Sequence, residues 1–230
     1  MTLLLIAIAP GLALAIFIYF KDKFEKEPLH LLLISFALGA LSTIPAFLME
    51  KAGIMLGFGQ SSNMLMTALF AFVVIGGSEE FCKYLMVRHY AFPKKDFNEP
   101  FDGIVYAVMV SLGFATLENI VYVLSQPSFA ESMQVGLLRM FTAVPAHAAF
   151  AIVMGYNIGK AKFDPAKKEQ WMKRGLFSAI VLHGAYDFFL LQNNVPGLGF
   201  LAIVVLIIGI RIARKSIKEH QDASPFKNGD

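Results

Sequence analysis

Seven apolar segments, most of them long enough to cross a lipid bilayer, constrain this chain more than any other feature of its sequence. A helix needs about 20 mostly apolar residues to span the hydrocarbon core. Only 16% of the residues are charged, well below the roughly one quarter that is usual in soluble domains. The sequence therefore predicts an all-α, polytopic transmembrane bundle with about seven spans. The predicted spans are residues 1–20, 29–49, 64–87, 101–124, 133–158, 175–191 and 198–210.

The basic residues predict the orientation of the bundle. Seventeen of the 20 Lys and Arg residues fall in loops one, three and five or in the C-terminal tail, and Lys51 is the only one in the other loops. Because cytoplasmic loops are enriched in Lys and Arg, we expect the N-terminus outside and the C-terminus in the cytoplasm. The first segment has no basic residue before Lys21, which favours a retained helix over a cleaved signal peptide. A net charge of only +3 does not indicate nucleic acid as a partner.

The chain shows no internal repeat and no linker that would separate two domains. We predict one integral-membrane domain over residues 1–221, with the functional motifs in about residues 22–188, and a disordered tail over residues 222–230. A single cysteine, Cys82, excludes an intrachain disulfide and a cysteine-rich metal site.

Eight ionisable residues lie inside the predicted spans and away from their ends, where each costs at least a few kcal/mol and usually marks function. Four are acids and two are permanent bases, which leaves a charge of −2 when both histidines are neutral. Protonated histidines, carboxylates that keep their protons or a bound divalent cation would each remove this excess. The eight residues are Glu79, Glu80, Lys83, Glu118, Arg139, His147, His183 and Asp187.

The third span carries the densest group of these residues. Glu79 precedes Lys83 by four residues, the spacing and order that favour a helical ion pair. Glu80 is rotated about 100° from Glu79, so we expect it to be free for another task. The pair alone is also explained by a structural role in locking two helices together. The preceding glycines, Gly76 and Gly77, let another backbone approach closely.

The fourth and fifth spans combine packing signals with polar side chains. Small residues recur every four positions from Gly103 to Ser111 and on to Asn119, and this pattern predicts tight helix packing. Packing does not explain Glu118, which lies beside the end of this row. Arg139 and His147 are eight residues apart and project from roughly one helical face. Pro145 frees the carbonyl of Phe141 and should bend the helix beside His147.

On the sixth span, His183 and Asp187 have i,i+4 spacing, so the carboxylate can fix the tautomer of the imidazole. The other ring nitrogen would then serve as a base or a metal ligand. A buried His–Asp pair is also a common structural hydrogen bond. We favour the functional interpretation because His147 and further acids accompany the pair, and we expect all these groups to meet in one pocket.

Four motifs in order resemble those of the PrsW intramembrane proteases, which cut membrane-bound anti-sigma factors. The resemblance covers about residues 22–188 and includes Glu27-Pro28. Ala107 and Ser111 depart from it, since they stand where glycines would be expected. The motifs are the EExxK stretch 79–83, the segment from Phe101-Asp102-Gly103 to Glu118-Asn119, Pro145-Ala146-His147 with Gly155, and the segment 183–188.

The family is similar to the CAAX prenyl proteases and bacteriocin-immunity proteins, whose shared core is a helical bundle around a membrane cavity. The resemblance implies that Glu79, Glu80, His147 and His183 form the catalytic centre. It also implies a bacterial cytoplasmic membrane protein whose partner is a single-pass substrate, such as an anti-sigma factor. The sequence leaves a glutamic and a metal-dependent mechanism open. Zinc would suit Glu80, His147 and His183, although no HExxH motif is present.

We therefore predict a peptidase in which Glu80 activates water, while Lys83 holds Glu79 in place. His147 and His183 would stabilise the oxyanion, directly or through a metal, and Asp187 would orient His183. Arg139 and Asn119 are candidate contacts to the substrate backbone, and Glu118 is a further supporting residue.

Two other classes of function remain open. A secondary transporter or proton channel would also use buried Glu, His and Asp, although the chain lacks repeated halves. A non-catalytic peptide-binding or immunity protein of the same superfamily would bind peptides without cutting them.

Overall fold

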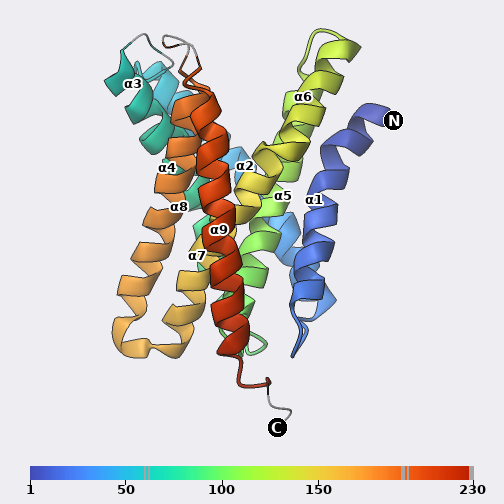
Figure 1. Cartoon of the computed structure of the whole chain (residues 1–230), viewed down its shortest axis with the longest axis vertical. Helices are drawn as coiled ribbons and strands as arrows, with labels where there is room; N and C mark the ends of the chain where they lie inside the picture. The colour runs from blue at the N-terminus through green and yellow to red at the C-terminus, as the bar shows by residue number, and fades with distance from the viewer. Residues whose placement is uncertain (60, 62, 193–194, 196, 228–230) are drawn as a thin grey trace.

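The computed structural model describes residues 1–59, 61, 63–192, 195 and 197–227, and the described residues contain helices but no strand. The chain runs up and down along one long axis, and the N-terminus and C-terminus lie toward opposite ends of it (Figure 1). In chain order the elements are α1 (Thr2–Lys21), α2 (Leu29–Met55), α3 (Met64–Leu69), η1 (Phe70–Ile75), α4 (Gly76–Met86), η2 (Val87–Ala91), α5 (Asp102–Leu124), α6 (Phe129–Phe141), α7 (Ala143–Phe163), η3 (Pro165–Lys167), α8 (Lys168–Leu190) and α9 (Phe200–Asp222).

Five helical stretches among the described residues are long and apolar enough to cross a membrane, which supports the predicted membrane bundle. They are residues 2–21, 29–55, 64–91, 102–124 and 129–163. The helices α8 and α9 have 23 residues each, which is long enough to span a membrane. Charged residues near their ends make them too polar to be identified as spans by length and composition. The count of seven spans and the predicted orientation therefore stay predictions.

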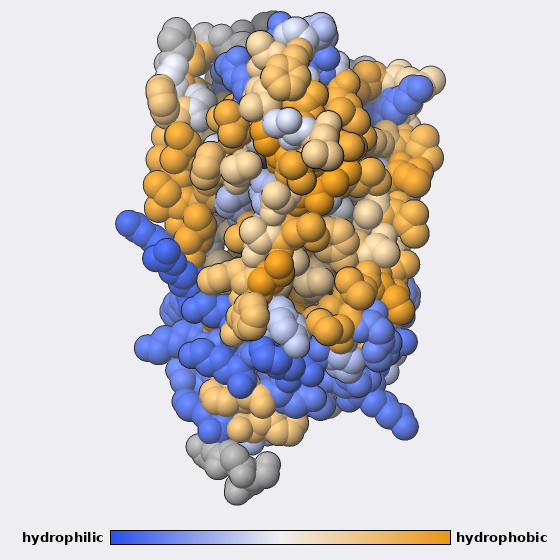
Figure 2. Space-filling model, turned by 90° about the vertical axis from the view of Figure 1, so that its right-hand side faces the viewer, coloured by the Kyte–Doolittle hydropathy of each residue, from blue (hydrophilic) through white to orange (hydrophobic). Residues whose placement is uncertain are grey.

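The surface agrees with a bundle that sits in lipid. In Figure 2, hydrophobic residues cover most of the visible face and hydrophilic residues gather at the lower end, where the chain terminates. Large apolar side chains such as Phe17, Leu33 and Ile44 are at least half exposed. Exposed apolar surface of this extent is unusual on a soluble monomer and indicates contact with lipid.

The helix α5 forms the centre of the bundle, and most of its residues are buried. It packs against α7 where the small residues predicted to face a neighbour meet one another. A Cβ atom added at Gly103 would lie 2.5 Å from the carbonyl oxygen of Gly155 and the same distance from the nitrogen of Gly159. No real Cβ fits there, so glycine permits this close approach of two backbones. The predicted packing role of the small residues on this helix is thus confirmed at Gly103.

The predicted fifth span is interrupted in the structure. The helix α6 ends at Phe141, and α7 starts at Ala143 after Thr142, whose φ of −120° and ψ of −73° are not helical. Pro145 cannot donate a hydrogen bond to the carbonyl of Phe141, which explains the break at this place. The predicted bend beside His147 is confirmed.

The C-terminal helix α9 extends to Asp222, and residues 223–227 continue in turns. The prediction of a disordered tail over residues 222–230 is not tested, because residues 228–230 lie outside the described part of the chain. The single domain over residues 1–221 likewise stays a prediction.

Candidate active site

The short helix α4 carries Glu79, Glu80 and Lys83 between two π-helical segments, η1 and η2. Such wide turns inside helices are frequently found at functional sites. Directly after η1, Gly76 lies against α8, where a Cβ atom would be 3.1 Å from the nitrogen of Gly184. Gly76 thus allows the close approach that the sequence predicts, and α4 packs here against the helix of His183.

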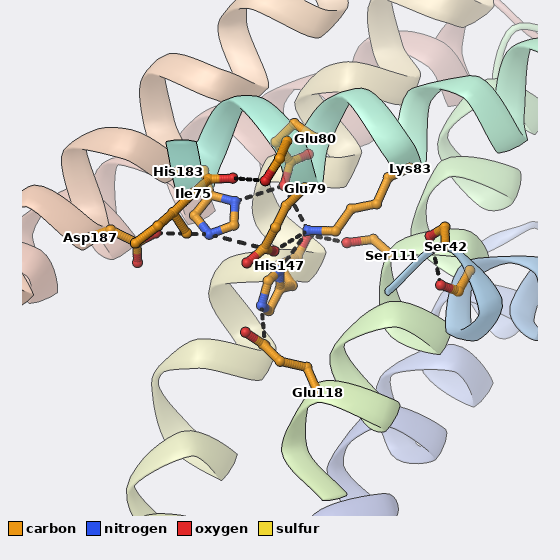
Figure 3. Close-up of polar contacts among 12 residues, drawn as sticks. Ser42, Ile75, Glu79, Glu80, Lys83, Ser111, Glu118, His147, His183 and Asp187 are labelled. Carbon is orange, nitrogen blue, oxygen red and sulfur yellow. Dashed lines mark hydrogen bonds and ion pairs between the residues drawn. The ribbon is translucent and has the colours of Figure 1, made fainter. Parts of the chain in front are cut away.

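Lys83 is the centre of the polar contacts (Figure 3). Its ammonium nitrogen lies 3.0 Å from Glu79 Oε2, 2.8 Å from Glu80 Oε1 and 3.0 Å from His147 Nδ1. It also lies 4.2 Å from the ring centroid of Phe114. The predicted pair of Glu79 and Lys83 is confirmed. The expectation that Glu80 is free of this lysine is wrong, because residues three apart on a helix are also neighbours.

His183 reaches three carboxylates from α8. Its Nδ1 lies 2.8 Å from Glu80 Oε1, and its Nε2 lies 3.2 Å from Asp187 Oδ2 and 3.9 Å from Glu79 Oε2. The contact to Asp187 has the distance of an ion pair, while Asp187 Oδ2 makes no contact with hydrogen-bond geometry among the described residues. The predicted partnership of His183 with Asp187 is present, but Glu80 holds the imidazole more tightly.

Glu118 joins the two helices on either side of the Thr142 break. Its Oε2 accepts from Arg139 Nη2 on α6 and lies 3.0 Å from His147 Nε2 on α7. Asn119 Oδ1 accepts from Arg139 Nε at 2.6 Å, and its amide donates to the carbonyl of Ala7 at 3.3 Å. Arg139 and His147 therefore meet the same carboxylate. The predicted contacts of Arg139 and Asn119 with substrate backbone are not tested.

The contacts of His147 define its tautomer. A lysine ammonium has donors only, so Nδ1 of His147 accepts from Lys83 and Nε2 carries the proton that points to Glu118. His147 is therefore neutral in this arrangement. Both nitrogens of His183, in contrast, face carboxylate oxygens, which only a doubly protonated ring satisfies. Of the three ways to remove the predicted negative excess, this geometry supplies one protonated histidine, which reduces the excess from −2 to −1.

A cavity of about 670 Å³ opens beside these residues, between α6, α7, α8 and α9. Its walls include Glu79, His147 and His183, together with apolar side chains such as Leu138 and Phe200. Glu80 and Lys83 are not among the described residues that line it. Of the two adjacent glutamates of α4, Glu79 is therefore the one with access to the cavity.

Four of these residues could hold a metal ion. Glu79, Glu80, His147 and His183 each offer a ligand atom, and the four atoms lie within 4.8 Å of one another. Two imidazoles with carboxylates form a donor set that suits zinc. One oxygen of Glu80, Oε2, is buried without a hydrogen-bond donor among the described residues. The residues present thus fit a metal by donor type and proximity.

Sequence reasoning missed some residues of this site. Glu50, near the end of α2, lines the cavity and lies 3.5 Å from the hydroxyl of Ser78. Its position one residue past a predicted span, beside Lys51, made it look like a loop residue. Ser111, noted only for packing, donates to the carbonyl of His147 at 3.1 Å. The helical spacing of Ser111 to Glu118, about two turns, is the signal that could have identified it.

Comparisons with known proteins agree with the geometry. The family model described as PrsW family intramembrane metalloprotease matches residues 27–211. Protease PrsW of Geobacillus kaustophilus is 37% identical over 187 residues, which are 81% of this chain and 79% of that protein. Protease PrsW of Bacillus subtilis is 34% identical over 216 residues, 91% of this chain and 93% of the relative.

A third relative, Protease PrsW of Clostridioides difficile, is 36% identical over 208 residues, 90% of this chain and 86% of its own length. No solved structure matches the chain at a significant level. The matches extend over most of the bundle and include every residue of the candidate active site. The chain belongs to the PrsW family of intramembrane proteases.

Proposed function

We propose that this chain is an endopeptidase of the bacterial cytoplasmic membrane that hydrolyses a peptide bond of a single-pass membrane protein. The observation that carries the proposal is the convergence of Glu79, Glu80, His147 and His183 beside a cavity in a bundle of membrane-length helices. Ionisable side chains buried at such depth usually mark function. Membership of a protease family makes hydrolysis the reaction that these groups serve.

We assign the general base to Glu79, because this carboxylate lines the cavity and Glu80 does not. The assignment differs from the sequence-based prediction, which gave this role to Glu80. The carboxylate of Glu79 takes a proton from a water molecule, and the water oxygen bonds to the carbonyl carbon of the scissile amide. Glu80 acts as a positioning residue, since it holds His183 at 2.8 Å and Lys83 at the same distance.

The tetrahedral intermediate carries a negative charge on the former carbonyl oxygen. His183 lines the cavity, and the contact of its Nε2 with Asp187 lacks hydrogen-bond geometry, so the Nε2–H group is the donor that we assign to this oxygen. The carboxyl of Glu79 then returns its proton to the amide nitrogen as the C–N bond breaks. One product leaves with a new carboxylate and the other with a new amine.

Zinc held by His147, His183 and a carboxylate of Glu79 or Glu80 would supply Lewis acidity and lower the pKa of a bound water. In the arrangement described here, Lys83 and His183 provide positive charge among the same carboxylates. We therefore propose to measure zinc in purified protein and in a His147→Ala, His183→Ala double variant. Zinc in the parent protein and its loss from the double variant would support a metalloprotease. Equal, negligible contents would support a glutamic type.

The cavity also indicates the class of substrate. Its walls combine the polar site with apolar side chains from α6 and α9, including Val135, Leu138 and Ile203. An apolar transmembrane segment fits such walls, but an intact helix shields its carbonyls, so the segment must unwind before water can attack. A membrane-anchored anti-sigma factor is the substrate that we propose, with cleavage toward the cytoplasmic half of the membrane.

The test is cleavage of a single-pass substrate that is reconstituted with the purified enzyme in vesicles. Removal of a general base costs typically about 10²–10⁴-fold in rate, and removal of an oxyanion donor about 10²–10³-fold, so we expect losses of these sizes for Glu79→Gln and for His183→Ala, respectively. Glu131→Gln, an exposed change in the first turn of α6, is the matched control and should cleave normally. Normal cleavage by Glu79→Gln would overturn the assignment.

A second comparison separates the two glutamates. Glu80→Gln keeps an oxygen that can accept from His183, so it should retain more activity than Glu79→Gln. The reverse order of activities would return the role of general base to Glu80.

A further inference from the structure

A second group of buried acids lies where the loop between α1 and α2 meets the start of α5. We call it the carboxylate cluster; it stands at the lower end of the bundle in Figure 1, where α1 ends. Four of its five members are at most 1% exposed, and the fifth, Glu25, is half-buried. A buried carboxylate without a partner is costly to ionise. The members of the cluster are Asp22, Glu25, Glu27, Glu99 and Asp102.

Protein donors orient three of these side chains through one oxygen each. Asp22 Oδ2 accepts from the backbone N–H of Glu27 at 3.3 Å, and Glu27 Oε2 accepts from the hydroxyl of Tyr106. Asp102 Oδ2 accepts from the backbone N–H groups of residues 98–99 at 2.7 and 2.8 Å. The second oxygen of each carboxylate is thereby fixed in direction, as for the ligands of a metal site.

These second oxygens, and one oxygen each of Glu25 and Glu99, have no hydrogen-bond donor among the described residues. The unpartnered buried atoms are Oδ1 of Asp22 and of Asp102, Oε1 of Glu27 and Oε2 of Glu25 and of Glu99. Ligand oxygens of Glu25, Glu27 and Asp102 lie within 4.8 Å of one another. Two oxygens that bind one Ca²⁺ at 2.3–2.6 Å can be up to about 5 Å apart, so the spacing is that of a shared cation.

The nearby lysines do not neutralise the cluster. Lys26 donates to the backbone carbonyls of Tyr19 and Asp22, and Lys162 donates to those of Phe92 and Lys94. None of the five acids forms an ion pair with a described residue. The positive charge that this site requires has to come from outside the chain or from protons.

We propose that the carboxylate cluster binds a hard divalent cation, Ca²⁺ or Mg²⁺, through Glu25, Glu27 and Asp102, with Asp22 and Glu99 beside it. Oxygen-only donors favour these ions over zinc, which prefers imidazole and thiolate. The cation ties the loop between α1 and α2 to the first turn of α5. This site is separate from the candidate active site, so its role is to fix the position of α5 and not to act on substrate.

Shared protons are the competing explanation. Burial raises the pKa of Asp22 and of Glu27 to about 7, so protons compete with a cation for these groups near neutral pH. The two explanations differ in one measurable respect. Only the cation site gives saturable binding of Ca²⁺ or Mg²⁺ that depends on the cluster residues.

The test uses full-length protein in detergent, after a chelator has removed metals, with Tb³⁺ as the luminescent probe for a calcium-type site. Tyr106 contacts Glu27 and can sensitise a bound Tb³⁺ ion. Ca²⁺ and Mg²⁺ are then added in separate titrations to displace the probe, which shows which ion the site prefers. The His147→Ala, His183→Ala background disrupts the imidazole site, so that its contribution can be recognised.

We expect Glu25→Gln to weaken displacement by the preferred ion at least tenfold and Asp102→Asn to abolish it. Glu169→Gln, on an exposed carboxylate that pairs with Arg88, is the matched control and should bind like the parent. Glu25 is half-buried, so Glu25→Gln should fold. This variant therefore tests the proposal even if Asp102→Asn fails to fold. Absence of saturable binding up to millimolar Ca²⁺ and Mg²⁺, or equal binding in Glu25→Gln and Glu169→Gln, would overturn the proposal.

Discussion

In the candidate active site, buried carboxylates face Lys83 and Arg139, whereas at the other end of α5 the five acids of the carboxylate cluster share a buried space with no ion-paired cation among the described residues. Both sites include a residue of α5, Glu118 in the first and Asp102 in the second. The first site contains its own counter-charges, and the second has to obtain them. The difference teaches that burial alone does not define a catalytic centre.

Removal of Lys83 should have the largest effect, because it would make the active site resemble the carboxylate cluster. Lys83→Met leaves Glu79 and Glu80 buried without their cation, and breaking a buried pair in this way costs about 3–5 kcal/mol. Thermal unfolding in detergent measures the loss. Lys51→Met, on an exposed lysine of α2, is the control. A parent-like unfolding temperature would show that the internal counter-charge does not stabilise this site.

The helix α5 connects the two sites, and a substitution between them tests whether its placement matters to both. A Cβ atom at Gly113 would lie 1.9 Å from the carbonyl oxygen of Phe36, so Gly113→Ala must push α2 and α5 apart. We expect a destabilisation of about 1–3 kcal/mol, the usual cost of overpacking. Chemical denaturation measures it, with Gly59→Ala, which meets open space, as the neutral control. Equal stability of the two variants would contradict the close contact.

Arg139 provides the second internal counter-charge, and its loss should affect activity more than folding. Arg139→Gln removes the cation from Glu118, which then faces His147 alone. We expect a fall in cleavage rate of about tenfold, which corresponds to about 1.4 kcal/mol. Arg139→Lys keeps the charge and should recover part of the rate. If both variants cleave at the parent rate, Glu118 does not need its ion pair.

The smallest effect is expected in the carboxylate cluster. Tyr106→Phe removes the hydroxyl that orients Glu27. A lost hydrogen bond to a buried group costs about 1–3 kcal/mol, and we expect a destabilisation near the low end of this range because a cation or proton compensates. Unfolding with and without Ca²⁺ measures how much of the loss the ion restores. Equal losses in both conditions would separate this hydroxyl from the cation site.

The sequence predicted the helical membrane bundle and the meeting of its polar groups, because hydrophobic runs and intramembrane charges are local signals. It also located the bend beside His147, since Pro145 lacks an N–H group and must interrupt the helical hydrogen bonds there. It did not predict the contact of Glu80 with Lys83. Spacings of three and four residues both allow contact with Lys83, and the π-helical segments that flank α4 leave no recognised mark in the sequence.

The carboxylate cluster escaped prediction for a different reason. Asp22 and Glu27 lie in a short polar connection, where acids are normally solvated. Only the fold shows that the start of α5 covers them. Glu50 was missed in the same way, since distance from a span end says little about burial.

The break at Thr142 has a mechanical consequence for the active site. Pro145 has no N–H to give to Phe141, so the hydrogen-bond ladder is interrupted there, and bending at this joint costs less than bending an intact helix. Arg139 lies on one side of the joint and His147 on the other, and both hold Glu118. The carboxylate of Glu118 thus connects the two helices on either side of the joint. If α6 moves away from α7, Glu118 must lose its contact with either Arg139 or His147.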